Sequence, residues 1–345
     1  MAEFLLGLPA LAEGALWATA RRLGAPVLVS ANALSLWTPR DRNGLRRWRG
    51  FDHRRLHLVA EHPVSLDSGG FVAAARYRGF PWAVRCYMDL CAAAPWRWFA
   101  SMDLCVEPEV AADRDEVLDR ISGTVRLNRD CLREARLRGI AERFVPVIQG
   151  WRADDYLRCL DLMPDLDEFP IVGVGSMCRR HVEGPTGILQ VVHELDQALG
   201  DSPTRLHLFG LKSQGMEAVR AHPRVWGFDS QAYGVAARQD ARKAGASKSN
   251  AYLAAVMERW YERQGERLVR PGFRFRAPLM PAISERPPPA GDVLEARLAE
   301  AREELRELHE AGEVEWTDLS PLRLLEWIAL DELPDDAEGV DALAP

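Results

Sequence analysis

The sequence predicts an α/β fold, a (β/α)8 barrel of the TIM type with a C-terminal helical appendage. Three observations support this prediction. Short apolar runs alternate with helix-compatible segments over much of the 345 residues. The runs are continuously apolar, which is typical of parallel strands buried on both faces. Several runs also end in a polar residue or in glycine, and barrel enzymes place such residues around one shared site.

Seven buried strands are recognisable by their apolar runs before residue 230. They span residues 26–30, 64–67, 98–103, 144–149, 171–175, 205–210 and 224–230. A closed barrel of this class has eight strands, and the pattern identifies no eighth. Residues 4–17 are also apolar, but Glu3 and Glu13 break the run and no basic segment precedes it. A signal peptide is therefore not expected.

Helices are expected between and after these strands. Residues 113–138 are the clearest case, because Val117, Ile121 and Val125 recur at helical spacing. The other expected helices of this part span residues 10–23, 81–94, 153–162, 185–199, 213–221 and 247–265.

Two domains are expected, a barrel over residues 1–265 and an appendage over residues 266–345. The appendage contains a proline-rich segment at 271–289, an amphipathic helix at 292–310 and an acidic tail from Asp331. The apolar stripe of the helix is too short for a free coiled coil. We therefore expect the helix to dock on the barrel or on a partner subunit.

Composition restricts the classes of function. The formal net charge of −7 excludes a basic nucleic-acid coat protein, and no run approaches the roughly 18 apolar residues that span a membrane. The six cysteines follow no framework spacing, so we expect reduced thiols in a cytoplasmic protein.

Three aspartates end predicted strands and would converge at the carboxyl end of the barrel: Asp67, Asp103 and Asp229. A single strand-end aspartate is more often a cap or a turn residue, but the recurrence favours one shared site. Two carboxylates that face one carbon support double displacement at a glycosidic centre, because one attacks while the other handles the proton. Asp103 and Gln149 would read the hydrogen-bonding edge of a planar base.

Glycines accompany these polar residues. Gly69, Gly70, Gly173 and Gly175 would let a flat ring approach the backbone closely. Phe71, and Tyr233 further along the chain, offer aromatic faces for stacking on such a ring.

The ordered set of motifs resembles the tRNA-guanine transglycosylase superfamily. Residues 66–71 (LDSGGF) are similar to its Asp-Ser-Gly-Gly-Phe signature, residues 147–150 (VIQG) to its Val-Gln-Gly strand, and residues 171–175 (IVGVG) to the strand that offers backbone groups to the base. Residues 208–211 (LFGL) and 227–230 (GFDS) resemble the paired strands that end in the nucleophile. The resemblance covers roughly two-thirds of the chain.

This resemblance implies a (β/α)8 barrel that exchanges a purine for a 7-deazapurine. It implies that Asp229 is the nucleophile on C1′ and that Asp67 is the general acid and base. The residues that it implies for base binding are Asp103, Gln149, Gly173, Ser68, Gly69 and Phe71.

One departure from the tRNA enzymes concerns zinc. Their zinc site, with three closely spaced cysteines and a histidine, follows the nucleophile, whereas here no cysteine follows Cys178. We therefore expect no metal and no cofactor. Cys178 with His181, or Cys86 with Cys91 and Cys105, has a spacing that could hold a metal, but buried thiols are the preferred interpretation.

The segments around the nucleophile look more like the DNA 7-deazapurine transglycosylases of the DpdA type. These segments are residues 209–213 (FGLKS) and 227–234 (GFDSQAYG). The resemblance therefore favours an enzyme that replaces guanine in DNA with a 7-deazapurine such as preQ0. Two alternatives stay open: the same exchange on tRNA, and a non-catalytic barrel subunit that binds nucleic acid. Partner proteins of a DNA-modification system would be compatible with the favoured function, and a membrane partner is not expected.

Two basic segments are candidates for contacts with DNA phosphates. The segment at residues 40–55 holds seven arginines, and because it follows the first recognised strand it should lie on the active-site face. The alternative is a solvated, salt-bridged loop. The second segment follows the nucleophile and contains Arg238, Arg242, Lys243 and Lys248. The residues assigned to nucleic-acid binding are Arg46, Arg47, Arg49, Arg238 and Lys248.

Overall fold

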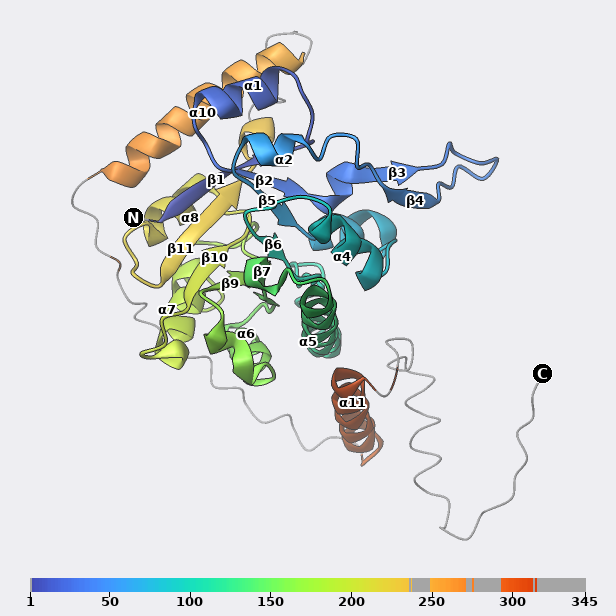
Figure 1. The fold of residues 1–345 in the computed structure, drawn as a ribbon. Coiled ribbons are helices and arrows are strands. Elements are labelled where there is room, and N and C mark those ends of the chain that lie inside the picture. The colour runs from blue at the N-terminus through green and yellow to red at the C-terminus, as the bar shows by residue number, and fades with distance from the viewer. Residues whose placement is uncertain are drawn as a thin grey trace. The chain divides into compact units, whose positions relative to one another are not determined.

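A computed structural model describes residues 2–235, 237, 249–270, 275, 293–312 and 314. The chain divides into two compact units, residues 1–282 and residues 283–345. The first unit contains a large sheet in which every pairing is parallel (Figure 1). The strands of this sheet are β1 (Glu3–Leu8), β2 (Val27–Ser30), β5 (Val64–Asp67), β6 (Phe99–Ala100), β7 (Phe144–Val145), β8 (Val147–Ile148), β9 (Ile171–Val174), β10 (Arg205–Leu208) and β11 (Val225–Ser230).

The strand order is β7-β6-β5-β2-β1-β11-β10-β9-β8. Its two outer members, β7 and β8, are consecutive in the chain and separated only by Pro146, which has no N–H to donate to a ladder. β7 pairs with β6, and β8 pairs with β9. The sheet therefore returns on itself through residues 144–148, and the (β/α) barrel that the sequence predicts is confirmed.

The strand that sequence patterns did not identify is β1. It lies between β2 and β11, with Glu3 opposite Gly227 and Leu6 opposite Val27. Its apolar residues are buried on both faces. The helix expected at residues 10–23 is shorter than predicted, because Pro9 and Gly14, which has φ of 137°, delay its start.

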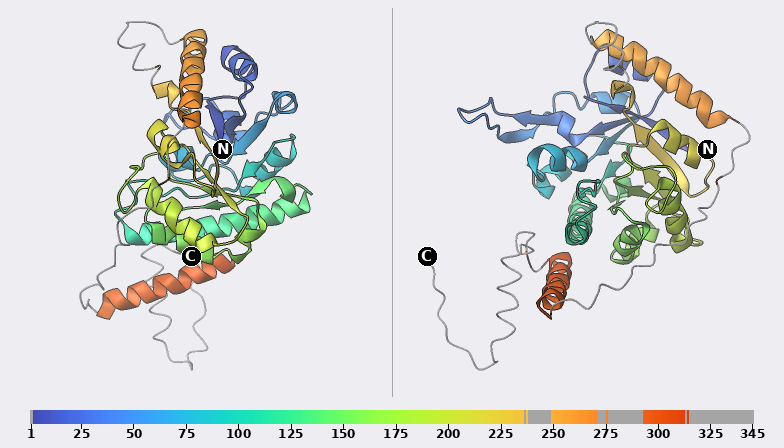
Figure 2. Two further views of the ribbon diagram at one scale, coloured as in Figure 1. Left: turned by 90° about the vertical axis from the view of Figure 1, so that its left-hand side faces the viewer. Right: turned by 180° about the vertical axis from the view of Figure 1, so that it is seen from behind.

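Helices follow the strands and surround the barrel (Figures 1 and 2). They are α1 (Ala15–Arg22), α2 (Leu58–Glu61), α3 (Gly70–Val72) with a π-helical turn (Ala73–Tyr77), α4 (Val84–Ala92), α5 (Arg114–Leu137), α6 (Ala153–Asp161), α7 (Ile188–Leu199), α8 (Ser213–Val219) and α10 (Asn250–Val269), and the 3-10 turns are Ala31–Leu34, Ala141–Arg143 and Pro164–Glu168.

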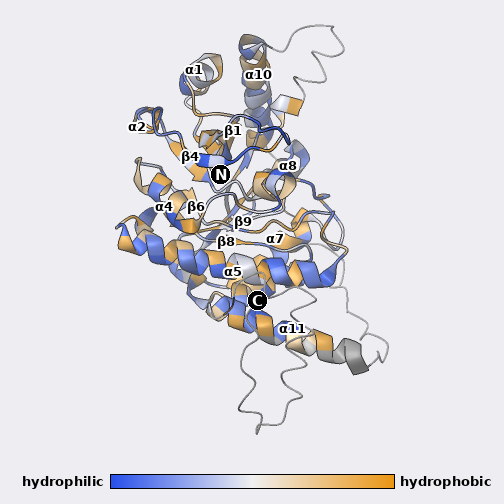
Figure 3. Ribbon diagram, turned by 90° about the vertical axis from the view of Figure 1, so that its right-hand side faces the viewer, coloured by the Kyte–Doolittle hydropathy of each residue, from blue (hydrophilic) through white to orange (hydrophobic). Residues whose placement is uncertain are grey.

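Sequence features account for the two longest of these helices. Asp113 caps α5 by accepting a hydrogen bond of 3.1 Å from the backbone N–H of Glu116. Figure 3 shows hydrophilic and hydrophobic residues alternating along α5, and Val117, Ile121 and Val125 on its apolar face are buried. Ser249 caps α10, which packs beside α1 and covers β1 through Trp260, whose ring centroid lies 5.5 Å from that of Phe4. α10 continues to Val269, past the domain boundary expected at residue 265.

Two apolar cores fix the barrel. One lies between the strands and the surrounding helices. The other fills the barrel interior, where it contains Leu5, Leu28, Trp98, Val145 and Val147, and it supports the residues at the carboxyl ends of the strands from below.

The arginine-rich segment at residues 40–55 belongs to a hairpin, in which it supplies the connection after β3 (Ser35–Trp37) and the strand β4 (Trp48–Phe51). β3 pairs antiparallel with β4, and the hairpin extends away from the barrel (Figures 1 and 2). Aromatic contacts hold its base, where the Trp37 and Tyr77 rings lie 4.6 Å apart and the Phe51 and Trp82 rings 5.1 Å apart.

The second unit contains α11 (Val293–Ala311), at the position expected for the amphipathic helix. The acidic tail and, apart from Phe275, the proline-rich segment lie outside the described residues. None of the helices in the described ranges is both long enough and apolar enough to cross a membrane.

Candidate active site

Four polar residues lie at the carboxyl ends of barrel strands. Asp67 ends β5, Asp103 follows β6, Gln149 follows β8, and Asp229 is the residue before the last of β11. Because all these strands are parallel members of one barrel, the four residues share one mouth. They form the candidate active site.

Asp67 lies in an environment that opposes its ionisation. The pKa of its carboxyl is raised from 3.8 to about 7, first by burial and then by the negative charges of Asp103 and Asp229. Hydrogen bonds from the Gly69 N–H, at 3.1 Å from Oδ2, and from the Ser30 hydroxyl oppose this rise only in part. Gly69 adopts φ of 85°, which lets its N–H turn back toward the carboxylate. Asp67 can therefore exchange a proton near neutral pH.

Asp103 belongs to a buried hydrogen-bond network. Its Oδ1 accepts a hydrogen bond of 2.9 Å from the Ser68 hydroxyl, and its Oδ2 accepts one from Gln149 Nε2. The Ser176 hydroxyl donates to Gln149 Oε1 at 2.7 Å and accepts from the Val106 N–H, which fixes the orientation of the Gln149 amide. Burial raises the pKa of Asp103, and the hydrogen bonds from Gln149 and Ser68 lower it.

Glycines make room for this network. A Cβ at Gly70 would lie 2.8 Å from the backbone oxygen of Asp103, and a Cβ at Gly175 would collide with the Gln149 amide. Gly173 has a different place, because a Cβ there would collide with the Phe209 ring inside the barrel. The structure therefore brings Gly175, and not Gly173, against the polar network.

A β-bulge places Asp229 at the mouth. Residue Val225 of β11 pairs with Leu206, but Gly227 already pairs with the next residue, His207, so Trp226 is the extra residue. Val225 and Phe228 both pack in the core between the strands and the helices. They are three residues apart, and residues three apart in a regular strand lie on opposite faces. The bulge restores the alternation, so that Asp229 faces inward while Phe228 faces outward.

Two groups contact the Asp229 carboxylate on the same oxygen. The Gly210 N–H lies 3.0 Å from Oδ1, and His207 Nε2 lies 3.2 Å from it. Asp229 is 9% exposed and His207 is fully buried. Gly210, with φ of 71°, bends the chain after β10 so that its N–H points at the carboxylate.

Sequence reasoning missed three residues of this site, namely Ser30, Ser176 and His207. For His207 a signal existed: it is a polar residue between Leu206 and Leu208, at an inward-facing and fully buried position of β10. Of the remaining predicted residues, Ser68 is buried at the network, whereas Phe71 is 48% exposed at the start of α3.

The arginines of the hairpin are accessible. Arg46, Arg47 and Arg49 are exposed, and none of them forms an ion pair with a carboxylate in the described ranges. Arg54 does form one, with Asp52 at 2.7 Å, which holds the pKa of Asp52 down to about 2. The alternative of a salt-bridged loop therefore fits Arg54 near the end of the segment, but not Arg46, Arg47 and Arg49. Arg238, Arg242, Lys243 and Lys248 lie outside the described residues.

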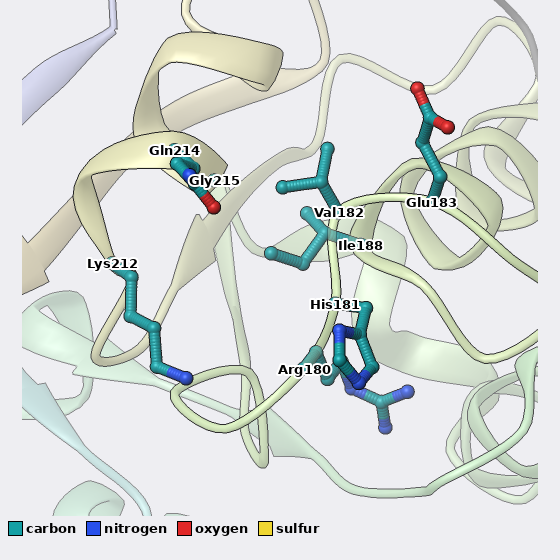
Figure 4. Close-up of a pocket in the computed structure, with 8 residues that line it drawn as sticks. All are labelled: Arg180, His181, Val182, Glu183, Ile188, Lys212, Gln214 and Gly215. Carbon is teal, nitrogen blue, oxygen red and sulfur yellow. The ribbon is translucent and has the colours of Figure 1, made fainter.

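A pocket of about 460 Å³ opens beside the loops that follow β9 and β10 (Figure 4). Arg180 lines this pocket but has a structural role, because its guanidinium donates to the backbone oxygens of Ser176, Gly150 and Thr186. None of the predicted site residues lines this pocket. Its lining residues are Arg180, His181, Val182, Glu183, Ile188, Lys212, Gln214 and Gly215.

All six cysteines are free thiols. Burial raises the pKa of Cys105 and of Cys178 to about 12, so neither is a ready thiolate ligand. Within the ranges that the structure describes, no three His, Cys, Asp or Glu side chains are grouped as metal ligands.

We expect the protein to fold and act without zinc. Treatment with a chelator should leave the melting temperature and the activity unchanged, and metal analysis of the purified protein should find less than one zinc per chain. Stoichiometric zinc together with unfolding on chelation would contradict this expectation.

The chain matches a known protein family. The family model described as DpdA, DeoxyPurine in DNA protein A, matches residues 45–281, which is more than half of the chain. The match includes all four polar residues at the barrel mouth. No curated protein matches the chain.

Proposed function

The chain belongs to the DpdA family, and on this premise we propose that it is a transglycosylase that replaces guanine in DNA with a 7-deazapurine such as preQ0. The observation that carries the proposal is the arrangement of Asp67 and Asp229 at one barrel mouth, beside the Asp103–Gln149 network. Two carboxylates with separate environments are suited to separate roles.

In the first half-reaction Asp229 acts as the nucleophile. A carboxylate oxygen forms a bond to C1′ of the deoxyribose, and the bond from C1′ to the guanine nitrogen breaks with its electron pair leaving on the base. Protonated Asp67 donates the proton that neutralises this base. The target nucleotide has to leave the base stack to reach the mouth.

In the second half-reaction the roles reverse. Ionised Asp67 accepts the proton of the incoming base, whose nitrogen attacks C1′ and releases the Asp229 carboxylate. The sugar–phosphate backbone stays intact throughout. A general acid and base that acts in both directions works best when its pKa lies near the working pH, and the pKa of Asp67, about 7, meets that condition.

The Asp103–Gln149 network is suited to base recognition. Asp103 is an acceptor and Gln149 offers both a donor and an acceptor, which matches the mixed edge of a guanine-like ring. Phe71, exposed at the start of α3, would stack on the base.

Nucleoside analysis tests the function. We expect mass spectrometry of DNA from cells that carry this gene, with its genomic neighbours, to show a 7-deazapurine deoxynucleoside that is lost when the gene is deleted. A loss confined to tRNA nucleosides would support the tRNA alternative. A modification that survives replacement of both aspartates would support a non-catalytic subunit.

The hairpin supplies a test of the polymer contacts. Replacing Arg46, Arg47 and Arg49 with alanine should weaken DNA binding, with little dependence on base sequence. It should also reduce the magnitude of the slope of log K against the logarithm of salt concentration by up to about 3. Titrations by fluorescence anisotropy at several salt concentrations would measure both quantities.

A matched variant controls for net charge. Arg133 and Arg136 on α5 and Arg263 on α10 are also exposed, and their replacement removes the same charge from the outer helices. If the two triple variants bind DNA equally well, the hairpin has no specific role in contacting phosphates.

A further inference from the structure

His207 has no assigned role, yet it contacts the proposed nucleophile directly. Its Nε2 lies 3.2 Å from Asp229 Oδ1, and the imidazole is fully buried. Three aromatic rings pack around it, with centroids at 4.7 Å for Phe209, 5.1 Å for Trp98 and 5.7 Å for Trp226. These contacts fix the ring plane and therefore the direction of Nε2.

The surroundings also determine which ring nitrogen donates. No described group hydrogen-bonds to Nδ1 of His207. The tautomer with hydrogen only on Nδ1 would leave a buried N–H without an acceptor and would turn the Nε2 lone pair toward a carboxylate. The other neutral tautomer and the imidazolium both carry hydrogen on Nε2. In either of these forms His207 donates to Asp229 Oδ1.

We propose that His207 is a positioning residue that, together with the Gly210 N–H, holds Asp229 Oδ1 and so selects Oδ2 as the attacking oxygen. This inference rests on the proposed function of Asp229. The hydrogen bonds from Gly210 and His207 both reach Oδ1 of the carboxylate. No described group donates a hydrogen bond to Oδ2. Two donors on one oxygen prevent rotation about the Cβ–Cγ bond, which leaves Oδ2 oriented toward the mouth.

The same contacts are useful after the bond has formed. When Oδ2 bonds to C1′ and guanine leaves with the electron pair of its glycosidic bond, Oδ1 becomes the carbonyl oxygen of the ester. It can keep both hydrogen bonds. When the incoming base attacks C1′, the electron pair of the C1′–Oδ2 bond returns to the carboxylate, and the donors stabilise the negative charge that reappears on it.

Two substitutions separate positioning from packing. His207→Phe keeps a buried ring of similar size but removes the donor, whereas His207→Gln can place an amide N–H near the position of Nε2. We expect His207→Phe to reduce the single-turnover rate of the covalent protein–DNA adduct by about 10- to 100-fold. We expect its affinity for DNA to stay at the wild-type value. His207→Gln should restore most of the rate.

The outcomes distinguish the two levels of the proposal. If the wild type forms an adduct and His207→Phe forms it within twofold of the wild-type rate, His207 does not position Asp229. The inference also fails if the Phe and Gln variants lose rate in proportion to a fall in melting temperature, because packing would then explain the effect. His207→Leu, which is smaller, replaces the Phe variant if that does not fold. An absence of adduct in the wild type overturns the proposed function itself.

Discussion

An Asp229→Asn variant is expected to bind DNA and the 7-deazapurine base normally but to form no covalent adduct, with base exchange reduced on the order of 10⁴-fold or more. The amide has nearly the shape of the carboxylate and can still accept from Gly210 and His207, but it is not an effective nucleophile. Denaturing electrophoresis of the protein with a labelled DNA duplex would detect the adduct, and release of labelled guanine would measure exchange.

Asp89→Asn is a suitable control for this experiment. The Asp89 side chain is 61% exposed on α4 and pairs with Arg138 away from the strand ends. The variant removes one carboxylate without touching the mouth, so its adduct yield should equal that of the wild type. If Asp229→Asn retains near-normal exchange while Asp67→Asn traps no adduct, the roles of the two acids are reversed.

The Asp67→Asn variant is expected to lose turnover by a different route. It should fail in proton transfer, which typically contributes about 10²- to 10⁴-fold to a rate. The pKa of about 7 also predicts opposite pH profiles for the two half-reactions of the wild type. Adduct formation needs protonated Asp67 and should fall above pH 7, whereas resolution of the adduct by incoming base needs ionised Asp67 and should fall below it. Rapid-quench measurements across pH 5.5–8.5, a range of about 1.5 units on either side of that pKa, would show whether the profiles cross. Identical profiles for both halves would contradict the assignment.

The same pKa shift predicts a stability effect that does not depend on activity. The folded protein holds the Asp67 proton more tightly than the unfolded chain, so the stabilisation is fully present below about pH 4 and is lost as pH rises to about 7. The loss is at most about 4 kcal/mol. Urea titrations should show that Asp67→Asn lacks this decline.

Sequence patterns located most of the barrel because its parallel strands are short apolar runs bounded by polar residues. β1 was not identified because the apolar run of residues 4–8 continues into further apolar residues, with no polar residue to mark the end of the strand. The strand and the following helix therefore form one apolar run in the sequence. Pro146 splits another strand in two, which the sequence can suggest, but only the pairings to β6 and β9 show that the barrel closes there. The hairpin was missed because its strands are only three and four residues long, too short to show a recognisable alternating pattern.

The site was predictable to the extent that it depends on strand ends. Asp67, Asp103, Gln149 and Asp229 were named because each ends an apolar run. The inward orientation of Asp229 depends on a one-residue bulge at Trp226, and no local sequence signal specifies which of two alternating faces a bulged strand presents. The contact between His207 and Asp229 depends on the register between β10 and β11, so it could not be predicted without knowing how these strands pair.

The position of β1 in the barrel has a consequence for how the chain folds during synthesis. Glu3 pairs with Gly227, so β1 is synthesised long before β11, the strand that pairs with one of its two edges. Contacts so distant in the sequence slow folding and leave strand edges exposed to other chains. Until β11 has been synthesised, β1 keeps one unpaired edge, and Asp229 cannot take its place at the barrel mouth. Barrel closure and assembly of the active site are therefore one late event, completed only after Ser230 has been translated.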